Sequence, residues 1–309
     1  MQRESGLPRV SVIVRAYNSE RYIGKALDSV LAQSYAGPID IIVPYDRRTT
    51  DGTAQILRAY REVKVPNRTV TIVEHIRPGT FRALQIGLGY ALGSPADYIL
   101  FLDSDDMLDE IYLERIIDTS LRSGATFLFS ESELIDEEGR PLGSRPVEVP
   151  RKDPYNVARL IGGNWVNCGG TLIERGCAAE IADRLAHLSQ TYFDNIHEDW
   201  LIAMLAFNIC RPLFVDDVRY YYRIHGRNTV FNAGGDRYKS MFNLESHLKT
   251  LVAYDALVDM DARQRRAWEI STLRRQQALL RILEGRGGWT MKFVGLVSRA
   301  AMKAAELLM

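Results

Sequence analysis

The sequence is poor in cysteine, carries no net charge and has no long uncharged apolar run. Its cysteines have neither metal-finger spacing nor the even count of a disulfide framework, which predicts a reducing, cytoplasmic environment: Cys168, Cys177 and Cys210. Residues 1–9 lack the apolar segment of a secretory signal, and no apolar stretch reaches the length of a membrane span. The 39 basic and 39 acidic side chains balance, so the charge gives no reason to expect nucleic acid as a partner.

The first half of the chain is a regular alternation of apolar runs and helical patterns. Four short runs have the composition of buried strands: residues 10–14, 39–43, 70–75 and 98–102. Apolar residues at helical spacing predict the helices between them: residues 20–33, 53–61 and 81–92. This alternation predicts a doubly wound α/β fold with a parallel sheet and right-handed crossovers.

The second half alternates less regularly. After a helix predicted over residues 109–123 and a strand near 126–130, a turn-rich connector leads to four further segments. These are a helix, an extended stretch, a second helix and a strand: residues 154–161, 166–173, 199–207 and 213–215. From residue 237 onward the pattern is helical only, so we expect a domain boundary near residue 235.

The strongest candidate site is a cluster of carboxylates at the end of the fourth predicted strand. Asp103, Asp105 and Asp106 directly follow the buried run, and parallel sheets bind their ligands at the carboxyl ends of their strands. Like charges this close repel unless a cation or hydrogen bonds offset the repulsion, and hard oxygen ligands favour Mg²⁺ or Mn²⁺. The alternative is a solvated acidic turn before the helix expected to begin near Asp109.

Four segments, in order, resemble a known enzyme family. Residues 10–18 and 22–35 are similar to the opening strand, loop and helix of inverting family 2 glycosyltransferases of the GT-A fold. Asp46 with the turn at 49–53 resembles the family's second acidic turn, and residues 103–106 stand where its Asp-x-Asp motif is expected. Four signals in the expected order are more specific than any one of them.

The resemblance implies a GT-A fold, which is a Rossmann-like, mostly parallel α/β sheet flanked by helices, here with a C-terminal helical extension. It implies a glycosyltransferase domain over residues 1–235, with a donor half at 1–110 and an acceptor half at 111–235, and an extension over 236–309. The donor would be a nucleoside-diphosphate-sugar. Because no glycine-rich phosphate loop follows the first strand, we expect Mn²⁺ or Mg²⁺ to neutralise the diphosphate in place of backbone amides.

The resemblance also implies roles on the donor side. Asp105 is the expected direct metal ligand, and Asp103 binds the ribose or reaches the metal through water. Further donor-binding residues are expected in the loops around them and on the third helix: Ala16, Tyr17, Asn18, Asp46, Arg82 and Ser104. Arg47 and Arg48 replace the usual acid and glycine of the second turn, and either grip phosphates or a carboxylated sugar or are solvated surface residues.

A second acidic pair, Glu198-Asp199, resembles the family's Glu-Asp motif, which implies that it supplies the catalytic base. Asp199 would take the proton of the acceptor hydroxyl, with Glu198 supporting it. The alternative is an ordinary helix start with acids in its first turn. In a Tyr-Arg-x-His segment, His225 is expected to complete the metal or diphosphate shell, with a packed histidine as the alternative, and Arg223 or Arg227 is expected to bind phosphate.

The last part of the chain, residues 289–309, has one apolar and one basic face when drawn as a helix. Such a helix docks on its own domain or a partner copy, or it lies on an anionic lipid surface where a lipid-linked acceptor resides. Because the cysteines fit a reducing environment and residues 1–9 lack a secretory signal, we expect a cytoplasmic protein. Peripheral contact with the inner face of the membrane and self-association through the C-terminal helices stay open as alternatives.

Together these features predict a metal-dependent, inverting glycosyltransferase that moves a sugar to the hydroxyl of a glycan, lipid-linked or small-molecule acceptor. Two other functions compete with it. One is a catalytically inactive nucleotide-sugar-binding or scaffold protein of the same fold, suggested by the altered turn at Arg47 and Arg48. The other is nucleotidyl transfer, which requires a glycine-rich, lysine-bearing loop after the first strand that the sequence lacks.

Overall fold

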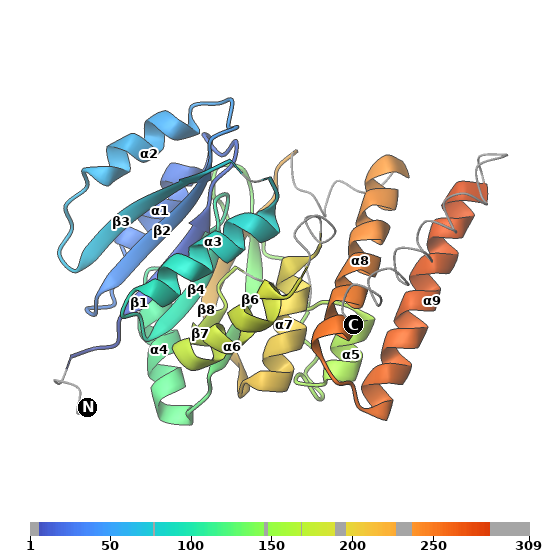
Figure 1. Cartoon of the computed structure of the whole chain (residues 1–309). Helices are drawn as coiled ribbons and strands as arrows, with labels where there is room; N and C mark the ends of the chain where they lie inside the picture. The colour runs from blue at the N-terminus through green and yellow to red at the C-terminus, as the bar shows by residue number, and fades with distance from the viewer. Residues whose placement is uncertain are drawn as a thin grey trace.

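The computed structural model describes residues 6–76, 78–144, 148–167, 169–188, 196–226 and 237–284. In this part of the chain, eight strands form one sheet in the order β3-β2-β1-β4-β7-β6-β8-β5. Two apolar clusters of buried side chains lie on the two faces of the sheet, each covered by helices (Figure 1). The architecture is the predicted α/β fold.

Four parallel strands form the first half of the sheet, as the sequence predicts. They are β1 (Val10–Arg15), β2 (Ile39–Asp46), β3 (Arg68–His75) and β4 (Tyr98–Asp103). Three helices connect them: α1 (Ile23–Leu31), α2 (Thr53–Arg61) and α3 (Thr80–Gly93). Because these strands are parallel, their carboxyl ends reach one edge of the sheet, where Arg15 is in register with Asp103.

The second half of the sheet adds antiparallel pairs. Its strands are β5 (Met107–Leu108), β6 (Phe127–Ile135), β7 (Leu172–Glu174) and β8 (Pro212–Arg223). β7 runs antiparallel to β4 and β6, β8 runs parallel to β6, and β5 pairs antiparallel with β8. β8 continues well beyond the predicted strand at 213–215 because residues 220–223 pair with β6 after a bulge. This extension brings the end of β8 to the acids that follow β4.

Three helices of the second half differ from the sequence-based expectations. They are α4 (Tyr112–Ser123), α5 (Val157–Gly162) and α6 (Arg175–Ala186). α4 begins later than predicted because the backbone N–H of Asp109 donates to the Arg219 carbonyl of β8, at 3.0 Å, instead of starting a helix. The sequence did not indicate α6, whose first turn is capped by the side chain of Glu174.

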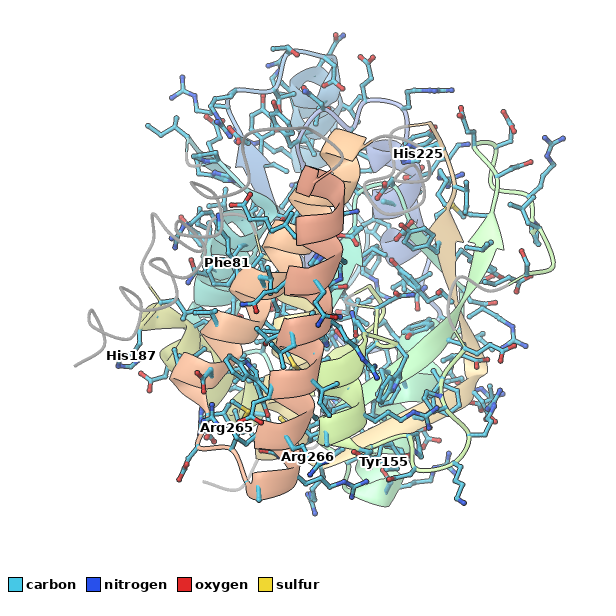
Figure 2. The ribbon with its side chains drawn as sticks, turned by 90° about the vertical axis from the view of Figure 1, so that its right-hand side faces the viewer. Phe81, Tyr155, His187, His225, Arg265 and Arg266 are labelled. Carbon is cyan, nitrogen blue, oxygen red and sulfur yellow. The ribbon has the colours of Figure 1, made fainter. Side chains whose placement is uncertain are left out.

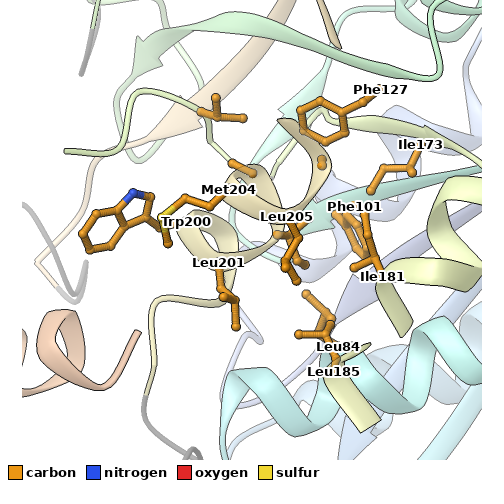
Figure 3. Packing of buried hydrophobic residues seen from close by; sticks show 14 of the residues in the cluster. Leu84, Phe101, Phe127, Ile173, Ile181, Leu185, Trp200, Leu201, Met204 and Leu205 are labelled. Atoms are coloured by element: carbon orange, nitrogen blue, oxygen red, sulfur yellow. The ribbon is translucent and has the colours of Figure 1, made fainter. Parts of the chain in front are cut away.

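α7 (Glu198–Ile209) runs through the core and is buried on nearly every side. Figure 3 shows its Leu201, Met204 and Leu205 among apolar side chains from β4, β6, β7, α3 and α6. A helix that is apolar all round is held by packing on every face. The first turn of α7, which carries the predicted catalytic pair, is therefore fixed to the centre of the fold.

Two long helices, α8 (Arg237–Leu257) and α9 (Ala262–Glu284), lie side by side at the end of the molecule opposite β3 (Figure 1). Figure 2 looks onto them and shows Arg265 and Arg266 at one end of the view and His225 at the other. They confirm that helices follow the sheet, while the amphipathic helix predicted at 289–309 lies outside the described residues. No helix in the described ranges combines the length and apolarity needed to cross a bilayer.

Candidate active site

The carboxyl ends of three parallel strands place the predicted donor-side residues at one edge of the sheet. Arg15 ends β1, Asp46 ends β2 and Asp103 ends β4. An isolated bridge between Ala16 and Tyr45 continues the pairing of β1 with β2 into the loops. The first-strand loop, the second acidic turn and the Asp-x-Asp segment therefore lie next to one another.

Two of the predicted metal ligands are in contact, and the third is not with them. Oδ2 of Asp105 lies 2.9 Å from Nε2 of His225, and their side chains are 32% and 8% exposed. Asp103 instead forms an ion pair with Arg15. Among the residues that the structure describes, no three His, Cys, Asp or Glu side chains are arranged as a ready-made metal site. Of the three predicted metal ligands, Asp105 and His225 are therefore brought together, and their role toward a metal stays a prediction.

Asp106 is a buried anchor for the acid turn, residues 103–106. It is 2% exposed and accepts hydrogen bonds from the Tyr220 hydroxyl and from the backbone N–H of Arg223, the latter at 2.8 Å. Burial and the charges of the neighbouring acids raise the pKa of Asp106 well above its usual value. Because Asp106 is fastened to β8, it is neither a solvated acid nor a charge at the start of α4.

Arg223 braces the acid turn from inside the fold. Its fully buried guanidinium donates at 2.7 to 2.9 Å to three backbone carbonyls, those of Asp105, Asp136 and Glu137. The same guanidinium lies 5.0 Å from the ring centre of Tyr22, and the His225 ring stacks on that ring at 4.9 Å. These contacts leave Arg223 no free donor for the phosphate it was expected to bind, and they fix His225 through Tyr22. Arg227, the other candidate for binding phosphate, lies outside the described residues.

Arg15 joins the two acidic motifs, a role that the sequence did not predict. Its Nη2 pairs with Asp103 and its Nη1 with Glu198, and its side chain is 11% exposed. Burial raises the pKa of Asp103, and the charge of Arg15 opposes that rise. The sequence shows only that a cation directly follows the first predicted strand, and its pairing with Asp103 depends on the register of β1 with β4.

Asp199 lies in the first turn of α7 with both carboxylate oxygens engaged. Oδ1 accepts the N–H of Trp200 at 2.7 Å, and Oδ2 accepts Nδ2 of Asn164 at 3.0 Å. Burial and then the charge of Glu198 raise the pKa of Asp199 to about 7. His197 takes the N-cap position and both acids lie in the first turn of α7, which the alternative interpretation also expects. Asn164 is a second site residue that the sequence did not predict, because no local pattern marks it.

The two arginines of the second acidic turn separate into different roles. Nε of Arg48 bonds both oxygens of Asp46 at 3.0 and 3.2 Å, and Nη2 reaches Oδ2 at 2.5 Å. Burial opposes ionisation of Asp46, but the bonds and charge of Arg48 hold its pKa below the usual value. Arg48 also lies 6.0 Å from the ring centre of Tyr17. Arg47 is a solvated residue, 64% exposed and 3.7 Å from Glu74.

The first-strand loop is held by its own polar side chains. Asn18, with φ of 47°, accepts the N–H of Thr50 at 2.9 Å through Oδ1. Ser19 Oγ lies 2.8 Å from Ser104 Oγ of the acid turn. These bonds tie the loop to both acidic turns and leave the ring of Tyr17, 54% exposed, as its open surface.

Arg82 lies in the first turn of α3 and is 5% exposed. Its Nη1 donates to Oε1 of Gln85, and its guanidinium lies 5.5 Å from the ring centre of Phe81. These contacts fix the side chain at the start of the helix. Its role toward a donor stays a prediction.

Comparison with solved structures shows the fold. TarS of S. aureus, solved with UDP-GlcNAc, is 18% identical with a TM-score of 0.56 and covers 97% of this chain and 89% of its own. Mannosyltransferase PcManGT from Pyrobaculum calidifontis, solved with GDP-Man and Mn²⁺, is 17% identical with a TM-score of 0.57 and covers 97% and 81%. Both are therefore similar in fold to this chain over nearly its whole length.

Comparison of sequences shows the family. The Escherichia coli protein WfgD, a UDP-Glc:alpha-D-GlcNAc-diphosphoundecaprenol beta-1,3-glucosyltransferase, is 28% identical over 204 residues, which is 65% of this chain and 71% of WfgD. The matches span about two thirds of the length of other curated glycosyltransferases, 67% and 65% in two of them. Residues 11–172 match the model of Glycosyl transferase family 2. The chain belongs to this family, and it is a glycosyltransferase of the GT-A fold.

Proposed function

We propose that the protein is a metal-dependent, inverting glycosyltransferase that uses a nucleoside-diphosphate-sugar and acts in polysaccharide or glycoconjugate biosynthesis. One observation carries the proposal: Arg15 joins the Asp-x-Asp segment, through Asp103, to the acidic pair of α7, through Glu198. The substrates in the name of WfgD support it, as do the UDP-GlcNAc of TarS and the GDP-Man and Mn²⁺ of PcManGT. The acceptor is a glycan, lipid-linked or small-molecule hydroxyl.

Asp199 supplies the general base in this proposal. A carboxyl group whose pKa lies near the working pH is deprotonated in a large share of the molecules and is still basic enough to take a proton. The pKa of Asp199 is about 7. The carboxylate takes the proton while the acceptor oxygen attacks the anomeric carbon from the face opposite the diphosphate, so the configuration inverts. Glu198, paired with Arg15, supports the base and does not take the proton itself.

The residues at the acid turn fit a divalent metal. Asp105 offers a partly exposed carboxylate beside the imidazole of His225, and Mn²⁺ accepts both kinds of ligand while Mg²⁺ prefers oxygen. Two protein ligands are enough, because such ions take their other ligands from phosphates and water. A bound metal neutralises the charge that grows on the departing diphosphate. Asp103, held by Arg15, would contact the ribose or a water of the metal shell.

The nucleoside is placed beside the first-strand loop. We assign its binding to Ala16, Tyr17 and Asn18 together with Asp46, because the exposed ring of Tyr17 offers a stacking surface next to a buried acid. Ser104 and Arg82 complete the donor side. The donor half then ends near residue 110, the acceptor half near residue 235, and the helical extension follows.

Donor turnover tests the proposal. The protein is incubated with Mn²⁺ and UDP-, GDP-, CDP- and dTDP-sugars in turn, released nucleotide is measured, and NMR identifies the anomer of the freshly released sugar. We expect one class of donor to be consumed with inversion, and Asp199→Asn to slow it by about a hundredfold or more. Asp118→Asn, an exposed acid paired with Arg122 on α4, is the matched control and should leave the rate unchanged.

Two results would contradict the proposal. Retention of configuration would exclude an inverting mechanism with Asp199 as base. Tight binding of a donor that is never turned over would favour the catalytically inactive alternative.

A further inference from the structure

Arg15 binds two carboxylates that come from distant parts of the chain. Asp103 ends β4, in the predicted donor half, and Glu198 begins α7, in the predicted acceptor half. One terminal nitrogen of the guanidinium serves each of them. The end of β1, where Arg15 lies, is fixed by pairing with β4 through the register of Arg15 with Asp103. The cation is therefore a rigid link between the acid turn at residues 103–106 and the first turn of α7.

The arrangement depends on the shape of arginine as well as on its charge. A guanidinium is planar and presents separate N–H groups to two partners, whereas a lysine ammonium is a point charge on a flexible stem. All three side chains are mostly shielded, with exposures of 11% for Arg15, 34% for Asp103 and 11% for Glu198. Removal of the cation leaves two shielded carboxylates facing each other without compensation, which is strongly unfavourable.

Arg15 also changes the charge that a metal ion meets. Four acids gather between the end of β4 and the start of α7: Asp103, Asp105, Glu198 and Asp199. Arg15 engages two of them and adds a positive charge that repels a second cation. A diphosphate brings its own negative charge, so a metal that arrives with it is less affected by Arg15.

Resting on the proposed function, we propose that Arg15 is a positioning residue that locks Asp103 and Glu198 together and makes metal binding depend on the diphosphate. In the donor-free protein, Arg15 takes the place of the metal as the cation of the acidic cluster. When the diphosphate is bound, Asp105 and His225 hold the metal while Arg15 keeps Glu198, and with it the first turn of α7, aligned on the donor.

Binding of Mn²⁺ in the absence and presence of nucleotide tests this inference. Electron paramagnetic resonance measures free Mn²⁺ in titrations of the full chain, alone and with UDP, GDP, CDP or dTDP in turn. We expect the parent to bind Mn²⁺ at least about tenfold more tightly with one of the four nucleotides than without. Arg15→Met should bind Mn²⁺ without nucleotide about fivefold or more tightly than the parent does, because the repelling charge is gone.

Two further variants separate charge from geometry and guard against misfolding. Arg15→Lys keeps the charge, so it should restore the weak nucleotide-free binding of Mn²⁺, yet its donor turnover should stay at least about tenfold below the parent. Arg9→Met is the matched control, because Arg9 directly precedes β1, at the end opposite Arg15, and forms an ion pair with Asp40 of β2. It should leave Mn²⁺ binding and turnover unchanged.

A stability cycle tests the link without metal. Arg15→Met and Glu198→Gln should each lower the unfolding midpoint, and the double variant should lose clearly less than the sum of the two. Strict additivity would overturn the positioning role. If the parent binds Mn²⁺ only with nucleotide and Arg15→Met does the same, this inference fails while the proposed function stands. If no nucleotide promotes Mn²⁺ binding by the parent, the proposed function fails and this inference with it.

Discussion

Asn164 holds the carboxylate of Asp199 from a loop outside α7. Its Nδ2 donates to Oδ2 of Asp199 at 3.0 Å, and its Oδ1 accepts the N–H of Val166 at 3.0 Å. The amide is fixed at both ends, so it sets the plane of the carboxylate. A general base must meet its proton within hydrogen-bond reach, which makes the orientation of Asp199 depend on Asn164.

Replacement of this amide should impair catalysis more than stability. We predict that Asn164→Ala lowers kcat about tenfold with little change in the affinity for donor nucleotide, because a turned base costs about 1.4 kcal/mol in the transition state. Steady-state kinetics with the accepted donor measures both. Asn208→Ala, which removes amide bonds to Met204 and Tyr254 at the far end of α7, is the matched control and should keep its kcat. Equal losses in the two variants would argue against a role for Asn164 in orienting the base.

The raised pKa of Asp199 predicts a dependence of stability on pH. Its pKa is about 7 in the folded protein against 3.8 ordinarily, so between these values the folded state holds a proton that the unfolded state has lost. Stability therefore falls as pH rises toward 7, and Asp199→Asn escapes that loss. We expect the stability of the variant relative to the parent to grow by about 2 to 3 kcal/mol between pH 5 and pH 8. Urea unfolding at both pH values measures it, and a difference that does not change with pH would show that Asp199 is not shielded.

The pairing of Arg48 with Asp46 predicts a specific role in donor binding. Arg48 fixes both oxygens of the buried acid and approaches the ring of Tyr17, so its removal leaves the acid without its partner. We predict that Arg48→Ala raises the Kd for nucleoside diphosphate about three- to tenfold. Arg47→Ala, at the adjacent solvated position, should not change it. Calorimetric titration of both variants with nucleoside diphosphate measures the two Kd values. An equal rise of Kd in Arg47→Ala and Arg48→Ala would mean that the positive charge of the turn, and not the pairing of Arg48 with Asp46, supports donor binding.

The C-terminal helices are expected to support the catalytic pair. Thr250 of α8 is fully buried and its Oγ1 accepts the N–H of His197, the residue before Glu198, at 2.9 Å. Thr250→Val leaves that N–H without its partner and should cost about 1 to 3 kcal/mol of folding free energy. We also predict a several-fold loss of kcat, since the start of α7 shifts. Thr250→Ser keeps the hydroxyl and should behave as the parent in denaturation and turnover; if it behaves as the valine variant, the hydroxyl is not responsible.

Much of the fold followed from local patterns, while the contacts of the site did not. The four parallel strands and the limits of α2, residues 53–61, could be predicted because apolar periodicity is a property of neighbouring residues. Arg15 and Asn164 could not, because their roles depend on the register of β1 with β4 and on a loop that meets α7. α6 was missed because its alanine-rich surface gives a weak apolar pattern.

Asp106 is a residue for which the local sequence predicts the wrong environment. Its sequence context, an acid before a helix, indicates a helix charge or a solvated turn. The structure buries it against Tyr220 and Arg223, which are more than a hundred residues away along the chain. Long-range pairing of β8 decides its role, and a single sequence carries no local trace of such pairing.

The most direct test of metal-dependent donor binding at the acid turn is thermal unfolding with nucleoside diphosphates and nucleotide sugars, with and without Mn²⁺. A ligand at a hundred times its Kd adds about 2.7 kcal/mol to the folded state, which is easily seen as a higher midpoint. We predict a rise for one nucleobase in the parent and in Asp118→Asn, only when Mn²⁺ is present, and none in Asp105→Ala. An equal rise in Asp105→Ala, or a rise in the parent that does not need Mn²⁺, would contradict the account.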